Sequence, residues 1–230
     1  MNTDAKNVSR IHSALAAFLL LLLFLLFLKS GVREQVTVEN LRALGANPWT
    51  PVLIVTAMTG AWTFALPGSV FFFITPLLFS PLASTGIICL GSATGTTMGY
   101  VAARYVGGPW IERFRNHRVT RFLERHSTFS SLFAMRVFPS SPHGFINYGA
   151  GLLKIPFPRF LVATLCGVGI KAFLYSTAIA GSVGASSIKE ALSWQTVTAL
   201  LVLTVLASVG HVLQRRWMKS DPRSDSVEQT

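Results

Sequence analysis

The chain has 230 residues, of which 51% are hydrophobic and only 13% are charged. Soluble domains usually carry about 25% charged residues, so this composition excludes an ordinary soluble protein. The formal net charge of +11 is typical of membrane proteins, whose basic residues gather in cytoplasmic loops beside anionic lipid, and does not by itself indicate a nucleic-acid partner.

A long run without charged residues lies in the first half of the chain. Not one Asp, Glu, Lys or Arg lies between Arg42 and Arg104, a run of 61 residues. A single helix of that length would measure about 90 Å, roughly three times the hydrocarbon thickness of a bilayer. The run therefore enters a membrane more than once, and we predict an all-α, polytopic integral membrane protein.

Four apolar segments are long enough to span a membrane. The first, 11–28, is longer than the apolar core of a signal peptide, and no small-x-small cleavage site follows it. We therefore expect a retained transmembrane anchor. The other predicted spans are 82–103, 160–183 and 191–213, and the polar segment 29–47 is expected to form a short helix at the membrane surface.

The basic residues predict how these segments are oriented. Lysine and arginine gather in the N-terminus (1–10), the loop 107–127 and the tail (214–230), and such clusters mark the cytoplasmic side. With all three in the cytoplasm, the four predicted spans account for every crossing of the membrane. The segments 48–80 and 128–156 must then each enter and leave the membrane on the same side. We expect two re-entrant hairpins, whose irregular backbone is tolerated where protein or water covers it. Both termini are then cytoplasmic, and the compact length without eukaryotic sorting signals favours a bacterial cytoplasmic membrane.

The two predicted hairpins are related in sequence. At an offset of 72 residues, the identical pairs are Pro67 and Pro139, Ser69 and Ser141, Phe73 and Phe145, Ile74 and Ile146, and Gly95 and Gly167. Because the predicted topology brings the hairpins in from opposite sides, the two units would form an inverted repeat of broken helices. In transporters built this way, the ligand site lies where the repeats meet.

Arg136 is the most informative single residue, because a guanidinium at membrane depth needs a partner. All nine acidic residues lie outside the predicted spans and hairpins: Asp4, Glu34, Glu39, Glu112, Glu124, Glu190, Asp221, Asp225 and Glu228. Arg136 therefore meets backbone carbonyls, water, lipid phosphate or an anionic ligand, and its forked side chain suits phosphate. We expect contact with a lipid or ligand, with bracing of the backbone as the alternative.

Other polar residues in the apolar segments are candidates for the same site. Lys171 lies inside a predicted span, where a ligand role and pairing with carbonyls are equally open. His143 either titrates or stays neutral and hydrogen-bonded. Asn147 either stabilises its hairpin or selects a substrate, and Arg104 either reaches the headgroups from the end of its span or joins the site. The hairpin tips add Pro67, Gly68, Ser69 and Pro139.

No sequence feature indicates an enzyme. The motifs HExxH and GxSxG are absent, and without a carboxylate in the membrane general acid–base catalysis would fall to His143 or a surface acid. The two cysteines are far apart and belong to no CxxC or Cys–His cluster, so they indicate neither a zinc site nor a disulfide framework. We expect no catalytic residue, no metal and no cofactor.

Three sequence blocks resemble, in order and spacing, those of the DedA or SNARE-associated Golgi protein family, also called VTT-domain proteins. The blocks are FALPGSVFFFITPLLFSP, GSATGTTMGYVAARYVGG and MRVFPSSPHGFINYGAGLLKIPFPRFLVATLCG. The resemblance covers roughly residues 45–185, and its most specific part is R-x-x-P…N-x-x-x-G at Arg136, Pro139, Asn147 and Gly151. It looks closer to the yeast-Golgi-type branch than to bacterial DedA.

The resemblance implies movement of lipids across bilayers: undecaprenyl phosphate or phosphatidylethanolamine in bacteria, and phospholipids in eukaryotic relatives. Two departures matter. DedA transporters carry an acid just after the Pro-Gly of the first hairpin, where this chain has Ser69, and a second arginine where this chain has Pro142 and His143. An uncoupled, scramblase-like path therefore fits better than proton-coupled transport in the DedA manner.

The sequence thus predicts flippase-like or scramblase-like movement of an anionic lipid or lipid phosphate between leaflets. Two alternatives stay open: a secondary transporter of ions or small solutes in which His143 titrates, and a non-transporting protein that organises the membrane. The expected partners are membrane lipids with anionic headgroups or a polyprenyl phosphate, without nucleic acid, and a homo-oligomer is left open.

Overall fold

The computed structural model describes residues 38–66, 68–106, 114–115, 118–138, 143–182 and 193–219, and all regular structure within these ranges is helical. The chain divides into two compact units, Met1–Ala43 and Leu44–Thr230. Helix α3 (Val38–Ala46) begins in the first unit, and all the helices discussed below lie in the second. The predicted anchor 11–28 lies outside the described residues, as do Pro67 and Pro139.

The second unit contains the same helical order twice: two short helices followed by a long one. The first set is α4 (Trp49–Thr63), α5 (Phe71–Leu78) and α6 (Pro81–Val101), with the short turn η1 (Gly68–Val70) before α5. The second set is α9 (Phe129–Val137), α10 (His143–Leu152) and α11 (Phe157–Ala180). Each of the segments 48–80 and 128–156, predicted as hairpins, therefore contains two short helices.

Local sequence explains where these helices begin and end. Both long helices start with proline in the first turn, where its missing N–H costs nothing and its fixed φ suits the helix. The side chain of Thr128 caps α9 by accepting from the backbone N–H of Ser131 at 3.3 Å. At the end of α4, Ala65 has a φ of 57°, and the backbone N–H of Leu66 donates to the Ala61 carbonyl at 2.8 Å. This left-handed residue stops α4 before the break.

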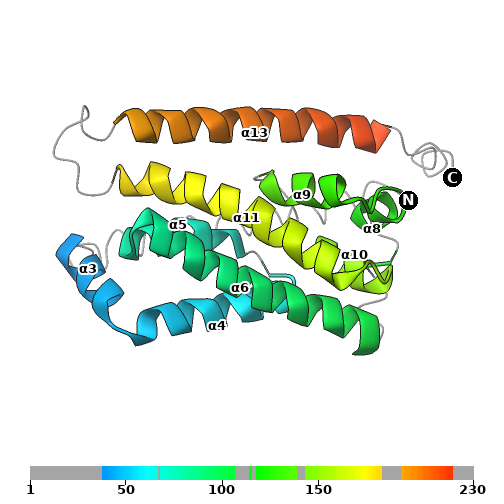
Figure 1. Ribbon diagram of the computed structural model, residues 1–230, viewed down its shortest axis with the longest axis horizontal. Helices are drawn as coiled ribbons and strands as arrows, with labels where there is room; N and C mark the ends of the chain where they lie inside the picture. Colours follow the sequence, from blue (N-terminus) through cyan, green and yellow to red (C-terminus); the bar gives the residue numbers. More distant parts are fainter. Residues whose placement is uncertain are drawn as a thin grey trace, which may run out of the picture. The chain divides into compact units, whose positions relative to one another are not determined.

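The long helices α6 and α11 run side by side in opposite directions. Tyr100 near the end of α6 contacts the rings of Phe157 and Phe160 at the start of α11, while Cys89 of α6 lies beside Gly169 of α11. Figure 1 shows α4 and α5 toward the left-hand end of this pair and α8, α9 and α10 at the right-hand end. The two sets of short helices thus flank the long pair from opposite ends.

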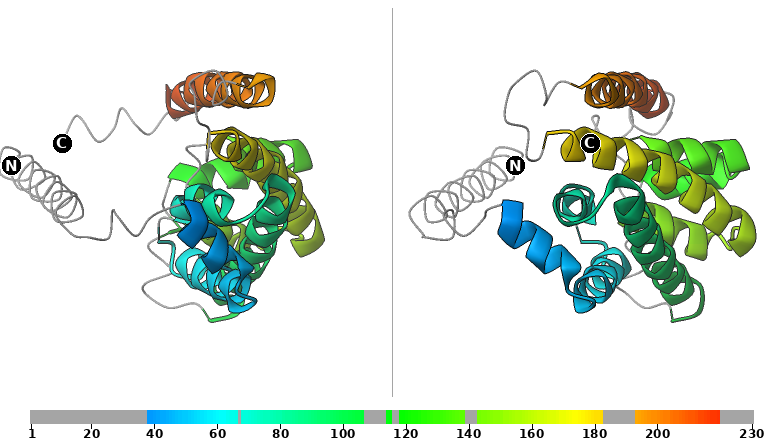
Figure 2. Two further views of the ribbon diagram at one scale, coloured as in Figure 1. Left: turned by 90° about the vertical axis from the view of Figure 1, so that its left-hand side faces the viewer. Right: turned by 60° about the vertical axis from the view of Figure 1, so that its left-hand side comes forward.

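Helix α13 (Trp194–Lys219) packs along α11 at the edge of the unit (Figure 2). Ala199 and Leu203 of α13 contact Ala178 of α11. The helix continues six residues beyond the predicted end of the last span at 213, because glutamine, arginine, methionine and lysine are good helix formers. Helix α8 (Arg118–Arg125) lies within the basic loop and was not predicted.

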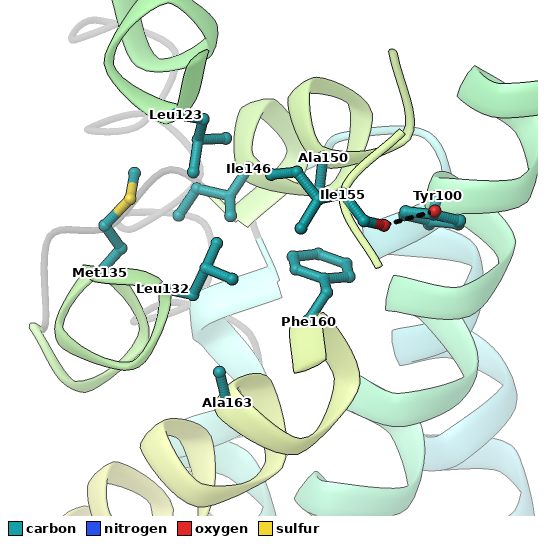
Figure 3. Close-up of a cluster of buried hydrophobic side chains, with 9 residues drawn as sticks. All are labelled: Tyr100, Leu123, Leu132, Met135, Ile146, Ala150, Ile155, Phe160 and Ala163. Carbon is teal, nitrogen blue, oxygen red and sulfur yellow. Dashed lines mark hydrogen bonds between the residues drawn. The ribbon is translucent and has the colours of Figure 1, made fainter. Parts of the chain in front are cut away.

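The largest hydrophobic cluster joins the second set of helices to α6 and α8. Figure 3 shows its side chains pointing toward a common centre: Tyr100, Leu123, Leu132, Met135, Ile146, Ala150, Ile155, Phe160 and Ala163. Tyr100 also carries the polar contacts of the cluster, because its hydroxyl donates to the Ile155 carbonyl at 2.7 Å and accepts from Arg104 at 2.5 Å. This contact connects the C-terminal end of α6 to the turn between α10 and α11.

We expect Tyr100→Phe to lower the thermal unfolding midpoint by roughly 2–4 °C, since a buried hydrogen bond contributes about 1 kcal/mol to stability. Tyr105→Phe is the matched control, because the Tyr105 side chain is 71% exposed. Thermal unfolding of the purified protein in detergent measures both. Equal midpoints for the two variants would contradict a structural role for the Tyr100 hydroxyl.

By length and hydropathy, α11 is the helix of the described ranges that is long and apolar enough to cross a membrane. The segments Gly68–Leu78 and Trp194–Gly210 are apolar but shorter. Many large apolar side chains face outward, among them Leu53, Leu82 and Leu201 with exposed fractions of 66%, 76% and 61%. An outward apolar surface of this kind is the one expected for contact with lipid.

Candidate functional site

Several helix ends meet beside the middle of α11. Trp62 comes from the last turn of α4 and Phe72 from the first turn of α5. Arg136 comes from the last turn of α9, and His143 is the first residue of α10. Here "cationic cluster" means Arg136, His143, Asn147 and Lys171. These four side chains are gathered from α9, α10 and α11 and are bounded by the rings of Trp62, Phe72 and Phe160.

Arg136 is fully buried, with 0% of its surface exposed. Its guanidinium donates to Oδ1 of Asn147 at 2.5 Å and lies 2.9 Å from Nδ1 of His143. The guanidinium carbon also lies 5.2 Å from the centre of the Phe160 ring. The close approach of α9 depends on Gly167, where an added Cβ would come within 2.6 Å of the Arg136 Cβ and 2.9 Å of the Phe133 carbonyl oxygen.

His143 holds the cluster together through both faces and both ring nitrogens. Its imidazole stacks on the indole of Trp62, with ring centres 4.3 Å apart and planes within 16°, and Phe72 lies nearly parallel at 6.4 Å. Nδ1 faces Arg136, and Nε2 lies 3.1 Å from Nζ of Lys171. His143 therefore joins the first set of short helices to the second.

Lys171 brings a second cation to the same place. The side chain is 2% exposed, and its Nζ lies 4.9 Å from the centre of the Phe72 ring, within the range of a cation–π contact. A neutral imidazole has one acceptor nitrogen and one N–H, whichever tautomer is present. Because Arg136 and Lys171 occupy both nitrogens of His143, one of the two cations faces an N–H instead of an acceptor.

The cationic cluster is therefore short of acceptors and of negative charge. Helices α4, α5, α6, α9, α10 and α11 contain no Asp or Glu, and the acidic residue described in the second unit is Glu124, exposed on α8. Three buried nitrogen donors at this place in the described structure have no hydrogen-bond partner: Nε of Arg136, Nδ2 of Asn147 and Nε1 of Trp62. Buried cations without counter-charge are costly, so this arrangement suits an anionic ligand that supplies the missing acceptors.

The structure brings together four of the predicted site residues, while Pro67 and Pro139 lie outside the described residues. Gly68 is buried against the indole of Trp62, at the edge of the cluster. Ser69 is exposed. Among the described residues, no three His, Cys, Asp or Glu side chains gather closely enough to hold a metal ion.

Arg104 lies outside the cationic cluster, in the π-turn η2 (Ala102–Val106) at the end of α6. It donates to the hydroxyl of Tyr100, and its guanidinium carbon lies 5.4 Å from the centre of the Tyr105 ring. The hydrogen bond to Tyr100 raises the pKa of Arg104 above its ordinary value. Arg104 thus stays charged at the end of its helix and apart from the cluster, and its contact with lipid headgroups stays a prediction.

Trp62 and Phe72 were not predicted to belong to the site. Both lie in apolar runs without charged neighbours, where an aromatic residue has no sequence signal that distinguishes a ligand-site wall from ordinary core. One signal was available. Trp62 carries an indole N–H, and a tryptophan buried in an apolar segment normally needs a hydrogen-bond partner.

Comparison with known proteins gives consistent results. Over 163 residues, 68% of this chain, the sequence is 28% identical to transmembrane protein 41B of Xenopus tropicalis. It is 26% identical over 160 residues to transmembrane protein 41B of Homo sapiens and 25% identical over 208 residues to that of Danio rerio. The chain spans 59% of the Xenopus protein, 55% of the human protein and 74% of the fish protein. No solved structure matches significantly.

The model of the VTT domain matches residues 66–181, half of the chain, and confirms the resemblance described for 45–185. The match includes Arg136, His143, Asn147 and Lys171, and excludes Trp62. Together with relatives named as transmembrane proteins, it identifies a membrane protein. The chain belongs to the VTT-domain family.

Proposed function

We propose that this protein moves an anionic lipid or lipid phosphate between the leaflets of a membrane, with the cationic cluster as the headgroup site. The observation that carries the proposal is the pair of buried cations, Arg136 and Lys171, surrounded by helices without a carboxylate. A phosphate group supplies both the negative charge and the acceptors that the cluster lacks.

Energetics support a transported ligand over a purely structural role. Desolvating one cation costs several kcal/mol even after relaxation, and here two cations share one imidazole. A packing role would be served at lower cost by apolar side chains of the same volume. A bound anion would supply the negative charge and the acceptors that the empty cluster lacks. Binding of an anion is therefore a physical reason for both cations to be present.

The helix arrangement supports a transporter of this kind. The order short–short–long occurs twice, and the two sets of short helices flank the antiparallel α6 and α11 from opposite ends (Figure 1). This is the arrangement expected for two opposed re-entrant hairpins, and the ligand site of such a repeat lies where the broken helices meet. In our proposal four spans and both hairpins form a multi-pass protein of a bacterial cytoplasmic membrane, with both termini in the cytoplasm.

The proposal is tested with the purified full-length protein in liposomes. Fluorescent phosphatidylglycerol and phosphatidic acid are compared with phosphatidylcholine carrying the same acyl chains, and a membrane-impermeant quencher reports the fraction in each leaflet. We expect the anionic lipids to exchange faster than in protein-free liposomes and faster than phosphatidylcholine. Exchange of both anionic lipids and of a labelled polyprenyl phosphate at the protein-free rate would overturn the proposal.

A further inference from the structure

Several buried hydroxyl groups on the helices beside the cationic cluster have no hydrogen-bond partners. Among the described residues, six side-chain hydroxyl oxygens are buried and unpartnered; one belongs to the half-buried Thr177, and the other five belong to Thr75, Ser92, Thr96, Thr164 and Ser176. All five residues have 0% of their surface exposed. They belong to α5, α6 and α11, and we call them the hydroxyl track.

Hydroxyls on the outer faces of the same unit behave differently. Thr97 of α6 donates to the Ala93 carbonyl at 2.7 Å, and Thr85 donates to the Pro81 carbonyl at 2.7 Å. On α13, Thr204 donates to the Leu200 carbonyl at 2.8 Å. Each of these half-buried or exposed residues bonds to the carbonyl four residues earlier in its own helix. This is the usual way in which the hydroxyl of a serine or threonine obtains a hydrogen bond in an apolar environment.

The track residues have the same carbonyls within reach and do not use them. Leaving a buried hydroxyl unpaired is costly, so five such groups on neighbouring helices are a large penalty in a dry interior. The penalty disappears if water or the oxygens of a ligand occupy the space between the helices in another state of the protein. Unpartnered buried groups in a native protein call for this kind of explanation.

Three of the track residues share a helix face with residues at the cationic cluster. Ser92 and Thr96 are four residues apart and therefore lie on one face of α6, and Gly99, three residues further along, approaches Asn147. Thr164 and Lys171 are seven residues apart on one face of α11. From Thr164 to Lys171 the helix rises by roughly 10 Å, a third of the roughly 30 Å hydrocarbon thickness of a bilayer, and Ser176 lies further along α11, about 120° around the helix from Thr164.

From these observations we infer that the hydroxyl track is a hydrated path along which a phosphate-bearing headgroup passes between α5, α6 and α11. Arg136 and Lys171 lie within this path and bind the phosphate, while the hydroxyls bind its oxygens and the accompanying water. This inference rests on the proposed function, but hydration of the track is measured separately from lipid movement.

Cysteine accessibility tests the hydration. In a background with Cys89 and Cys166, the two native cysteines, replaced by alanine, single cysteines are placed on the track (Ser92→Cys, Thr164→Cys) and on the outer faces (Thr97→Cys, Thr204→Cys). Ser127→Cys, half-buried in the turn between α8 and α9 and outside the predicted spans, is the reference position. Each protein in liposomes is treated with a charged methanethiosulfonate, and the mass increase is followed with time.

We expect both track cysteines to react and both outer cysteines to react at least about tenfold more slowly, because a thiol in apolar surroundings loses thiolate by a factor of ten for each unit of raised pKa. Reaction at Ser127→Cys alone would overturn the inference, and so would equal rates at track and outer positions. If the track cysteines react but no anionic lipid moves in the wild-type protein, the path stands and the proposed function fails.

A second comparison tests the role of the hydroxyls in transfer. Thr164→Val removes a track hydroxyl with little change in volume, and Thr97→Val removes an outer one. We expect Thr164→Val to slow transfer of phosphatidic acid by about tenfold, corresponding to one lost hydrogen bond of about 1.4 kcal/mol, and Thr97→Val to leave the rate unchanged. Equal rates in the two variants would show that the track hydroxyls do not contact the headgroup.

Discussion

Arg136→Ala is expected to reduce transfer of anionic lipid by roughly thirtyfold or more while the protein still inserts into the membrane. The variant loses charge-assisted hydrogen bonds worth about 2–3 kcal/mol to a phosphate group. Because Arg136 has no carboxylate partner among the described residues, its removal leaves no opposite charge buried. The measurement is leaflet exchange of fluorescent phosphatidic acid, normalised to the amount of folded protein in the liposomes.

Two further variants show whether the charge or the geometry of Arg136 matters. Arg136→Lys keeps the charge but cannot bond Asn147 and His143 together, so we expect an intermediate rate. Arg159→Ala removes an exposed arginine from the first turn of α11 and should leave the rate unchanged. A wild-type rate per folded molecule in Arg136→Ala, with only the amount of protein reduced, would instead favour a structural role and a membrane-organising protein.

Gly167→Ala is expected to lower the stability of the protein. The added Cβ would lie 2.6 Å from the Cβ of Arg136 and 2.9 Å from the Phe133 carbonyl oxygen, so α9 has to move away from α11. Overpacking of this kind costs about 1–3 kcal/mol. We expect a lower midpoint of thermal unfolding and, because Arg136 moves with α9, slower lipid transfer.

The matched control is Gly86→Ala on α6. An added Cβ at Gly86 meets nothing within 4 Å, and alanine is about 1 kcal/mol more favourable than glycine inside a helix. The control should therefore unfold at the wild-type temperature or slightly above it. A Gly167→Ala protein as stable as Gly86→Ala would mean that α9 and α11 do not pack as closely as the structure indicates.

The long helices were predictable because their signals are local. The predicted spans 82–103 and 160–183 correspond to α6 and α11 within about three residues at each end, since proline and apolar length define a membrane helix without reference to neighbours. Helix α8 was not predicted because a segment with several arginines is typical of an exposed loop. The structure nevertheless buries its Thr120 and Leu123.

The candidate site was only partly predictable. Arg136 and Lys171 could be found because a charge in an apolar segment is conspicuous and its possible partners can be counted along the chain. Trp62 could not be assigned to the site in this way, because nothing local distinguishes its ring from core. The contact of His143 with both cations depends on three helices meeting, and residue spacing within any one helix carries no information about that meeting.

The sequence by itself determined that the protein is helical and membrane-embedded, that it resembles the VTT-domain family, and that any buried cation lacks a nearby acid. These properties follow from the amino-acid composition and from the order of the residues along the chain. The tertiary structure decided that Arg136, His143, Asn147 and Lys171 form one cluster, that Arg104 stands apart from it, and that five hydroxyls face inward without partners. The physical reason is that helix packing brings together side chains separated by many residues, and the direction of each buried hydroxyl is set by its neighbours on other helices.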